Sequence, residues 1–166
     1  MKYQPLHNKM KSFEDVTNPA IAPEMYIVAR LHSRGIVEHR LQSMIETTEH
    51  LMTCGFNVTY AYTEHHEISL LFDIKENSYE RKTSKLISIL AAEASAKLTQ
   101  LSGDLATFDS RIIALPNKNL VVDYFRSRVT DSDNSSWSYW KGGKKSIREL
   151  ITVRTGEMIA DLMSTD

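Results

Sequence analysis

The residues of this chain best suited to acid–base or metal chemistry are His65, His66 and Glu67, which follow one another, and His32, which lies earlier in the chain. Two imidazoles and one carboxylate are a competent ligand set for zinc, manganese or another transition metal. A pair of imidazoles can also act as general acid and general base on a phosphodiester without a metal. Either chemistry requires the fold to bring His32 beside His66 and Glu67.

The hydrophobic pattern indicates the strands that would position these residues. Residues 58–62 and 68–72 both alternate between two faces, which predicts two strands joined by a short polar connection. On the second strand, one face carries Ile68, Leu70 and Phe72, and the other carries Glu67, Ser69 and Leu71. The histidine pair and Glu67 therefore lie at the mouth of a β-hairpin, where its second strand begins.

An earlier apolar strand, residues 25–31, ends at His32-Ser33-Arg34-Gly35 and is followed by a helix predicted over residues 37–54. A β-α-β-β order closes most simply into an antiparallel sheet whose third strand lies beside the first, as in the ferredoxin-like arrangement. Antiparallel neighbours bring the end of one strand next to the start of the other. We therefore expect His32 and His66 to face each other at one edge of the sheet, with Glu67 alongside.

The rest of the chain completes one α/β (α+β) domain over residues 1–166. The periodicity predicts a helix over 79–101, a strand over 106–115, a helix after Pro116-Asn117 and a last helix over about 146–163. Residues 1–24 are a polar extension with one helical turn at 12–16. We expect an antiparallel βαββαβ sheet with helices on one face, followed by a helical C-terminal extension over 142–166.

Composition limits the function classes. The chain has 166 residues, of which 42% are hydrophobic, and a formal net charge of -1, so any contact with RNA must come from a local basic patch. Cys54 is the only cysteine, which excludes an internal disulfide and agrees with a reducing compartment. The apolar runs are too short to cross a bilayer, and the N-terminus lacks a signal-peptide core. We therefore expect a cytoplasmic protein with no membrane partner.

Two groups of basic residues could bind phosphate. Arg81 and Lys85 are four residues apart at the start of a predicted helix, where the helix dipole disfavours unpartnered positive charges. Their spacing fits a solvated charged end or a bound phosphate. The second group is a candidate patch for the RNA backbone, or else a solvated face, and consists of Arg126, Arg128, Lys144 and Lys145.

Five stretches of the chain carry characteristic motifs, at residues 30–35, 61–71, 84–88, 108–116 and 119–128. In this order, and over nearly the whole chain, they resemble the tRNA-His guanylyltransferase family, the 3′-to-5′ reverse polymerases. The resemblance is closest to the compact bacterial and phage-type members. It implies a polymerase-like palm in which two aspartates hold two magnesium ions while a nucleotide is added to an RNA 5′ end. It also implies GTP or ATP as ligand, tRNA or another RNA as partner, and assembly into dimers or tetramers.

The resemblance also assigns site residues. By resemblance, Lys85, with Arg81 nearby, contacts a triphosphate, and Arg34 and Ser84 match family positions. Asp109 and Arg111 match as well. His65 occupies a position where the family has a serine, and by resemblance it belongs to the nucleotide-binding residues together with Arg34, Arg81, Ser84 and Lys85.

The chain departs from the family at the metal positions, where His32 and His66 replace the two aspartates and only Glu67 of the acidic cluster is retained. Magnesium prefers oxygen ligands, so the ordinary two-metal mechanism should fail. Three hypotheses follow. The palm binds a nucleotide or an RNA 5′ end without catalysis; or His32, His66 and Glu67 support altered chemistry, with manganese, zinc or histidine acid–base catalysis; or Glu67 and substrate phosphates still hold magnesium. We expect a binding protein that has lost the two-magnesium transfer.

Overall fold

The computed structural model describes residues 3–34, 41–64, 66–129, 136–142 and 145–151. Its central element is a six-stranded sheet in the order β4-β1-β3-β2-β5-β6, in which all neighbours are antiparallel. The strands are β1 (Tyr26–Arg34), β2 (Val58–Glu64), β3 (Glu67–Phe72), β4 (Thr107–Leu115), β5 (Ser136–Gly142) and β6 (Lys145–Ile151). The β2–β3 hairpin and the placement of β3 beside β1 confirm the topology predicted from the sequence.

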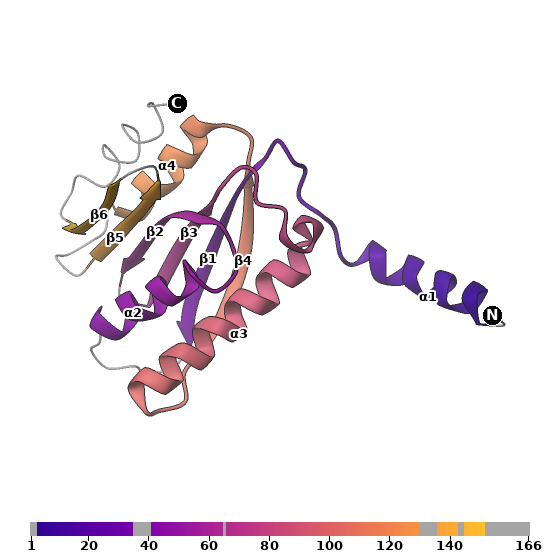
Figure 1. Cartoon of the computed structure of the whole chain (residues 1–166), viewed down its shortest axis with the longest axis horizontal. Helices are drawn as coiled ribbons and strands as arrows, with labels where there is room; N and C mark the ends of the chain where they lie inside the picture. The colour runs from indigo at the N-terminus through magenta and orange to yellow at the C-terminus, as the bar shows by residue number, and fades with distance from the viewer. Residues whose placement is uncertain (1–2, 35–40, 65, 130–135, 143–144, 152–166) are drawn as a thin grey trace.

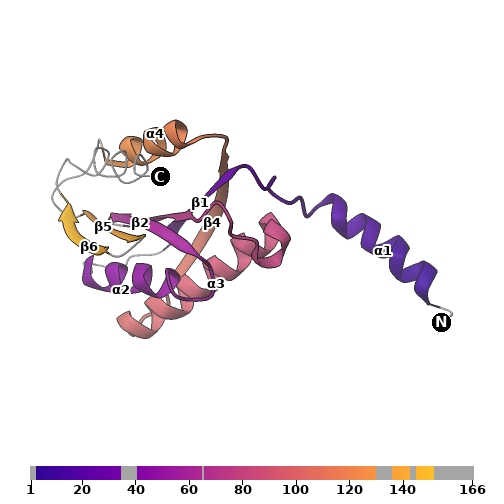
Figure 2. The same cartoon turned by 45° about the horizontal axis from the view of Figure 1, so that its top comes forward.

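Helices cover the two faces of the sheet unequally (Figures 1 and 2). The helices α2 (Leu41–Leu51) and α3 (Thr83–Ser102) lie on one face, and α4 (Lys118–Val129) lies on the other. The helix α1 (Gln4–Val16) projects away from the sheet and has no buried residue. Within the described residues, no helix is long and apolar enough to span a membrane.

The two faces contain two apolar clusters, because successive strand residues point to opposite sides. The larger cluster joins α2 and α3 to the sheet through side chains that include Leu31, Ile68, Leu70, Phe72, Leu86 and Leu90. The smaller one lies beneath α4 and includes Val28, Tyr60, Tyr62, Leu71, Val121 and Phe125. The predicted faces of β3 are therefore confirmed.

Three sequence-based expectations were wrong. The predicted helix over 146–163 is β6 as far as Ile151, because residues 145–151 pair with β5; residues 152–166 lie outside the described part. The predicted single turn at 12–16 is the end of a helix of 13 residues. The helix predicted from residue 79 begins at Thr83 and is preceded by a short 3-10 turn, η1 (Ser78–Arg81).

Arg81 fastens this turn to the chain segment before β1. Its side chain donates all five of its hydrogen bonds to backbone carbonyls, those of Ile21, Ala22, Met25, Ile74 and Glu76. Tyr79, Glu80 and Arg81 have φ of 53°, 55° and 59°, a left-handed conformation that is unfavourable for residues other than glycine. The five bonds offset the cost of that conformation.

Glu76 stabilises the same turn from the other side. Its carboxylate accepts hydrogen bonds from the backbone N–H groups of Asn57 and Ser78, at 2.5 and 2.7 Å. Burial alone would raise the pKa of Glu76, but the hydrogen bonds from Ser78 and Asn57 outweigh it, so the pKa lies below its ordinary value of 4.5. The ionised form is therefore the one that the folded protein favours.

We expect Glu76→Gln to reduce the free energy of unfolding at pH 7 by about 1 to 2 kcal/mol. Because the folded-state pKa of Glu76 is lowered, its contribution is complete above the unfolded pKa and is lost as the pH falls through the folded pKa. Wild type should therefore lose more stability than the variant between about pH 5 and pH 3. Urea unfolding across this range measures the difference. Glu80→Gln, at a neighbouring exposed position, is the control, and equal pH slopes for wild type and Glu76→Gln would contradict the assignment.

Candidate functional site

On the sheet face that α4 covers, the side chains change from apolar to polar along the strands. An apolar row of β4, β1, β3 and β2 lies toward α4 and consists of Ile113, Val28, Leu71 and Tyr60. Two residues further along each strand, the next row consists of Arg111, Arg30, Ser69 and Tyr62. The last row consists of Asp109, His32, Glu67 and Glu64. We call these last two rows the polar edge.

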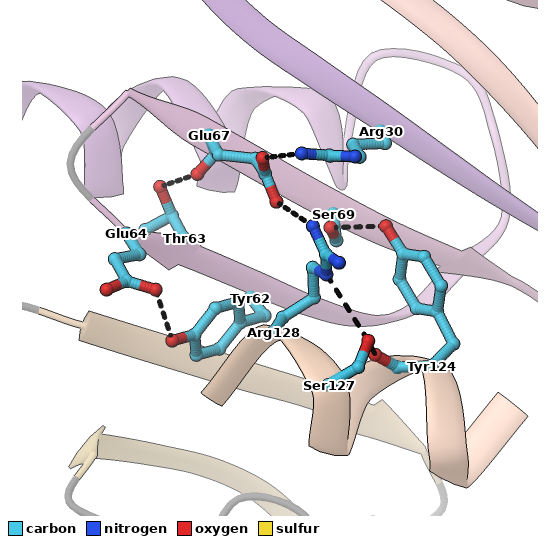
Figure 3. A network of polar contacts seen from close by, with 9 residues as sticks. All are labelled: Arg30, Tyr62, Thr63, Glu64, Glu67, Ser69, Tyr124, Ser127 and Arg128. Atoms are coloured by element: carbon cyan, nitrogen blue, oxygen red, sulfur yellow. Dashed lines mark hydrogen bonds and ion pairs between the residues drawn. The ribbon is translucent and has the colours of Figure 1, made fainter. Parts of the chain in front are cut away.

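Glu67 is the centre of the polar edge (Figure 3). Its Oε2 accepts a hydrogen bond from Nη2 of Arg30 at 2.5 Å, and its Oε1 lies 3.5 Å from Nη1 of Arg128. The side chains of Arg30, Arg128 and Glu67 are only 29%, 27% and 21% exposed, so solvent screens these pairs incompletely. The hydrogen bond that Arg30 donates to Glu67 raises the pKa of Arg30 above its ordinary value. One carboxylate thus joins β1 to α4 through β3.

The helix α4 supplies the other partners of this network. The guanidinium carbon of Arg128 lies 5.6 Å from the centre of the Tyr124 ring, within the range of a cation–π interaction. The hydroxyls of Tyr124 and Ser69 are 3.0 Å apart. Burial raises the pKa of Tyr124 above its ordinary value, so its hydroxyl is neutral at pH 7. Arg128 is therefore held by the ring of Tyr124 on its own helix and by the carboxylate of Glu67 on β3.

The expected pairing of His32 with His66 was wrong by one position. His32 lies opposite Glu67 on β3 and opposite Asp109 on β4. The carbonyl of His66 instead accepts a hydrogen bond from the backbone N–H of Ser33 at 2.7 Å. Both histidines are exposed, and His65 lies outside the described residues. The polar edge therefore brings together His32 and Glu67, with His66 in the turn that precedes β3.

The residues at the polar edge do not fit a two-magnesium centre. His32 and His66 offer nitrogen where the resemblance implies carboxylate oxygen, and the carboxylate of Glu67 already faces two guanidinium groups. Among the described residues, no three His, Cys, Asp or Glu side chains are grouped so that they could hold a metal ion. The ligand set of His32, His66 and Glu67 is likewise not assembled there.

The predicted nucleotide-binding residues divide between opposite ends of the sheet. Arg34 is exposed at the end of β1, beyond His32. Ser84 and Lys85 are exposed at the start of α3, where Ser84 Oγ donates to Asn18 Oδ1 at 2.5 Å. Arg81 lies beside them but is only 4% exposed, and it donates its five hydrogen bonds to backbone carbonyls. Because Arg81 precedes α3, the expectation that it shares a helix face with Lys85 was wrong. Arg81 bonds to Met25 before β1, and His32 lies seven residues further on, about 20 Å at the rise of a strand.

The candidate RNA-binding residues are also separated. Arg126 is exposed on α4, whereas Arg128, predicted on the polar face of that helix, is turned toward Glu67. Lys145 is the first residue of β6, and Lys144 lies outside the described residues.

Arg30, Ser69 and Tyr124 belong to the polar network but were not predicted as site residues. Strand alternation could have indicated the first two, since Arg30 is two residues before His32 and Ser69 is two residues after Glu67. The four-residue spacing of Tyr124 and Arg128 on a helix could have indicated the third.

An antiparallel βαββαβ sheet, with α2 and α3 on one face and polar residues at the strand ends of the other, defines a palm-type α+β domain. Residues 37–116 match the family model described as Thg1, tRNAHis guanylyltransferase. These residues make up slightly less than half of the chain, and over them the chain is similar to the tRNA-His guanylyltransferase family.

Solved structures share this fold. A bacterial tRNA(His) guanylyltransferase (Thg1)-like protein in complex with GTP has a TM-score of 0.79 at 17% identity, with 93% of this chain and 96% of that chain covered. The same kind of bacterial protein in complex with ATP gives 0.77 at 16% identity, with coverage of 92% and 96%. The tRNA(His) guanylyltransferase from Saccharomyces cerevisiae gives 0.62 at 19% identity, with 74% and 63% covered. Comparison with curated protein sequences gave no match.

We expect a double-mutant cycle to separate the two ion pairs of Glu67. With Arg30→Met and Glu67→Gln, the coupling energy should be about 1 kcal/mol, because the pair is close and partly desolvated. With Arg128→Met and Glu67→Gln it should be smaller, because the 3.5 Å pair is longer. Urea unfolding of the single and double variants gives both values. A larger coupling for Arg128 than for Arg30 would contradict the geometry described above.

Proposed function

We propose that this protein binds a nucleoside triphosphate, GTP or ATP, or the 5′ end of an RNA such as tRNA, at the polar edge of its palm. The observation that carries the proposal is the group of arginines on this face of the sheet, Arg30, Arg34, Arg111 and Arg128. Guanidinium groups bind phosphate oxygens through two parallel hydrogen bonds. The similar bacterial fold solved with GTP and with ATP supports a nucleotide as the ligand.

The ordinary two-magnesium nucleotidyl transfer is lost in this proposal. Imidazoles at positions 32 and 66 remove negative charge from the place where two cations would be held. The ion pairs of Glu67 reduce the remaining attraction for a cation.

A second candidate function is an enzyme with altered chemistry. His32 is exposed and lies in register between the carboxylates of Glu67 and Asp109, an arrangement suited to a general acid or base. This candidate predicts a labelled product when the protein is incubated with GTP or ATP and a tRNA transcript, with magnesium, manganese or zinc. Product that disappears in His32→Ala or His66→Ala would favour it. Nucleotide binding without product under any of these conditions would favour the binding protein.

Titration calorimetry with GTP, and filter binding of a 5′-triphosphorylated RNA, test the site. We expect Arg34→Ala to weaken both ligands by about tenfold or more, the loss of one charge-assisted hydrogen bond. We propose Lys85 and Ser84 as a second phosphate contact. This contact lies one helical turn beyond Arg81, which bonds to Met25 before β1, whereas His32 lies toward the other end of β1, about 20 Å from Met25 at the rise of a strand. Lys85→Ala should therefore weaken the RNA more than GTP. Lys97→Ala, on the same helix, is the matched control.

Equal losses for Lys97→Ala and Lys85→Ala would show a general effect of charge and contradict the second contact. Unchanged affinity of Arg34→Ala for both ligands would place the nucleotide elsewhere.

We propose further that the protein assembles as a dimer or tetramer through α1. Tyr3, Leu6, Met10 and Phe13 follow the alternating spacing of three and four that forms a helix-pairing stripe, and they are 79%, 57%, 44% and 64% exposed. An isolated helix of this length is marginal in water. Basic residues (Lys9 and Lys11) precede acidic ones (Glu14 and Asp15), so an antiparallel second copy would oppose unlike charges.

The assembly is tested by sedimentation velocity of wild type and of the double variant Leu6→Ser, Phe13→Ser. We expect wild type to sediment as a dimer or tetramer at tens of micromolar, and the variant as a monomer whose circular dichroism spectrum loses no more than the helical signal of α1. Asn8→Ser, on the polar side of the same helix, should assemble like wild type. Monomeric wild type would overturn the proposal.

A further inference from the structure

We infer that Arg30 and Arg128 form a phosphate-binding pair whose internal counter-ion is Glu67, so that a phosphate group binds by displacing this carboxylate and needs no divalent metal. The inference rests on the proposed function, because it concerns how the same edge recognises its ligand. It goes beyond that proposal in naming Glu67 as the group that the incoming phosphate displaces and in predicting that binding is independent of magnesium.

The geometry of Glu67 is that of a phosphate substitute. Its two oxygens contact guanidinium groups from different elements, Arg30 on β1 at 2.5 Å and Arg128 on α4 at 3.5 Å. A phosphate presents oxygens of the same charge to the same donors, and in greater number. The pair leaves room for exchange because the contact with Arg128 is long, so an incoming anion can take that guanidinium first.

Contacts other than those with Glu67 hold the side chain of Arg128 and the backbone of Arg30. Arg128 lies over the ring of Tyr124, and its Nε is 3.4 Å from Ser127 Oγ (Figure 3). The backbone of Arg30 is fixed by the pairing of β1 with both β3 and β4. If Glu67 moves away, the guanidinium group of Arg128 therefore remains close to its position, and a pre-positioned group loses less conformational entropy on binding.

The same geometry explains why no metal is needed. In a two-metal palm, carboxylates attract cations and the cations attract phosphate. Here the carboxylate faces two permanent cations, and these guanidinium groups would repel a divalent ion placed beside Glu67. Phosphate recognition is thereby transferred from ions to side chains that cannot be removed by a chelator.

The test uses the full chain and titration calorimetry with inorganic tripolyphosphate and with GTP, each in EDTA and in magnesium. We expect wild type to bind in EDTA, with a change of less than about twofold when magnesium is added at a concentration that leaves the free ligand in excess. Glu67→Gln should bind about tenfold more tightly, because the competing charge is removed while the side-chain shape is kept. Arg30→Met and Arg128→Met should each weaken binding by about tenfold.

Asp123→Asn is the matched control for Glu67→Gln, since it removes one negative charge from an exposed position of α4. Its affinity should change less than that of Glu67→Gln. Thermal melting of each variant shows whether it is folded, and the affinity gain of Glu67→Gln cannot arise from unfolding.

The outcomes separate this inference from the proposed function. Binding that requires magnesium and is lost in Glu67→Gln would overturn the inference and leave the nucleotide-binding proposal standing. Binding in EDTA that neither Glu67→Gln nor the arginine variants alter would also overturn it, because the phosphate would then bind elsewhere. No binding of either ligand under any condition would overturn the inference together with the nucleotide-binding part of the proposed function, whose RNA part is decided by the filter-binding experiment described above.

Discussion

The antiparallel register of β1 between β3 and β4 is the constraint on which the polar edge depends. It places Arg30 beside Ser69 and Arg111, and His32 beside Glu67 and Asp109. A shift of one residue on any of these strands would turn a whole row to the opposite face, into the cluster with α2 and α3. The buried faces on that side, with Leu31, Ile68 and Phe108, make such a shift costly. The packing of the apolar core therefore fixes the positions of the polar-edge side chains, which lie outside the core.

The spacing of apolar residues, together with the residues that favour turns and helix ends, was enough to predict most of the palm. The alternation at residues 58–62 and 68–72 gave the hairpin, and Asn117, whose Oδ1 accepts from the N–H of Leu120, marked the start of α4. The failures have physical causes. Residues 145–151 have an apolar pattern that fits a helix, but their pairing with β5 is a non-local interaction that no local pattern reports. The left-handed conformation at residues 79–81 was not predicted because it depends on the five carbonyl partners of Arg81, some of which precede β1 in the sequence while the others follow β3.

The candidate site was predicted in part. The sequence indicated His32 and Glu67 at one edge, because strand ends and hairpin mouths are visible in the pattern. The ion pairs of Glu67 were not visible, because they depend on where the end of α4 lies over the sheet. A single carboxylate read from the sequence appears available to a metal, while the fold supplies it with two permanent cations. The similarity of residues 37–116 to the tRNA-His guanylyltransferase family concerns the scaffold, whereas the contacts of Glu67 are features of this chain's own side chains.

The boundary between the apolar row under α4 and the polar rows beyond it has a consequence for how such a protein can evolve. Val28, Leu71 and Ile113 belong to or pack against the apolar cluster beneath α4, whereas His32 and Asp109, four positions further along β1 and β4, are exposed. Substitutions at exposed positions usually change stability little, so the chemistry at these strand ends can change while the architecture persists. The palm then serves as a stable platform on which selection can rewrite ligand preference one strand end at a time.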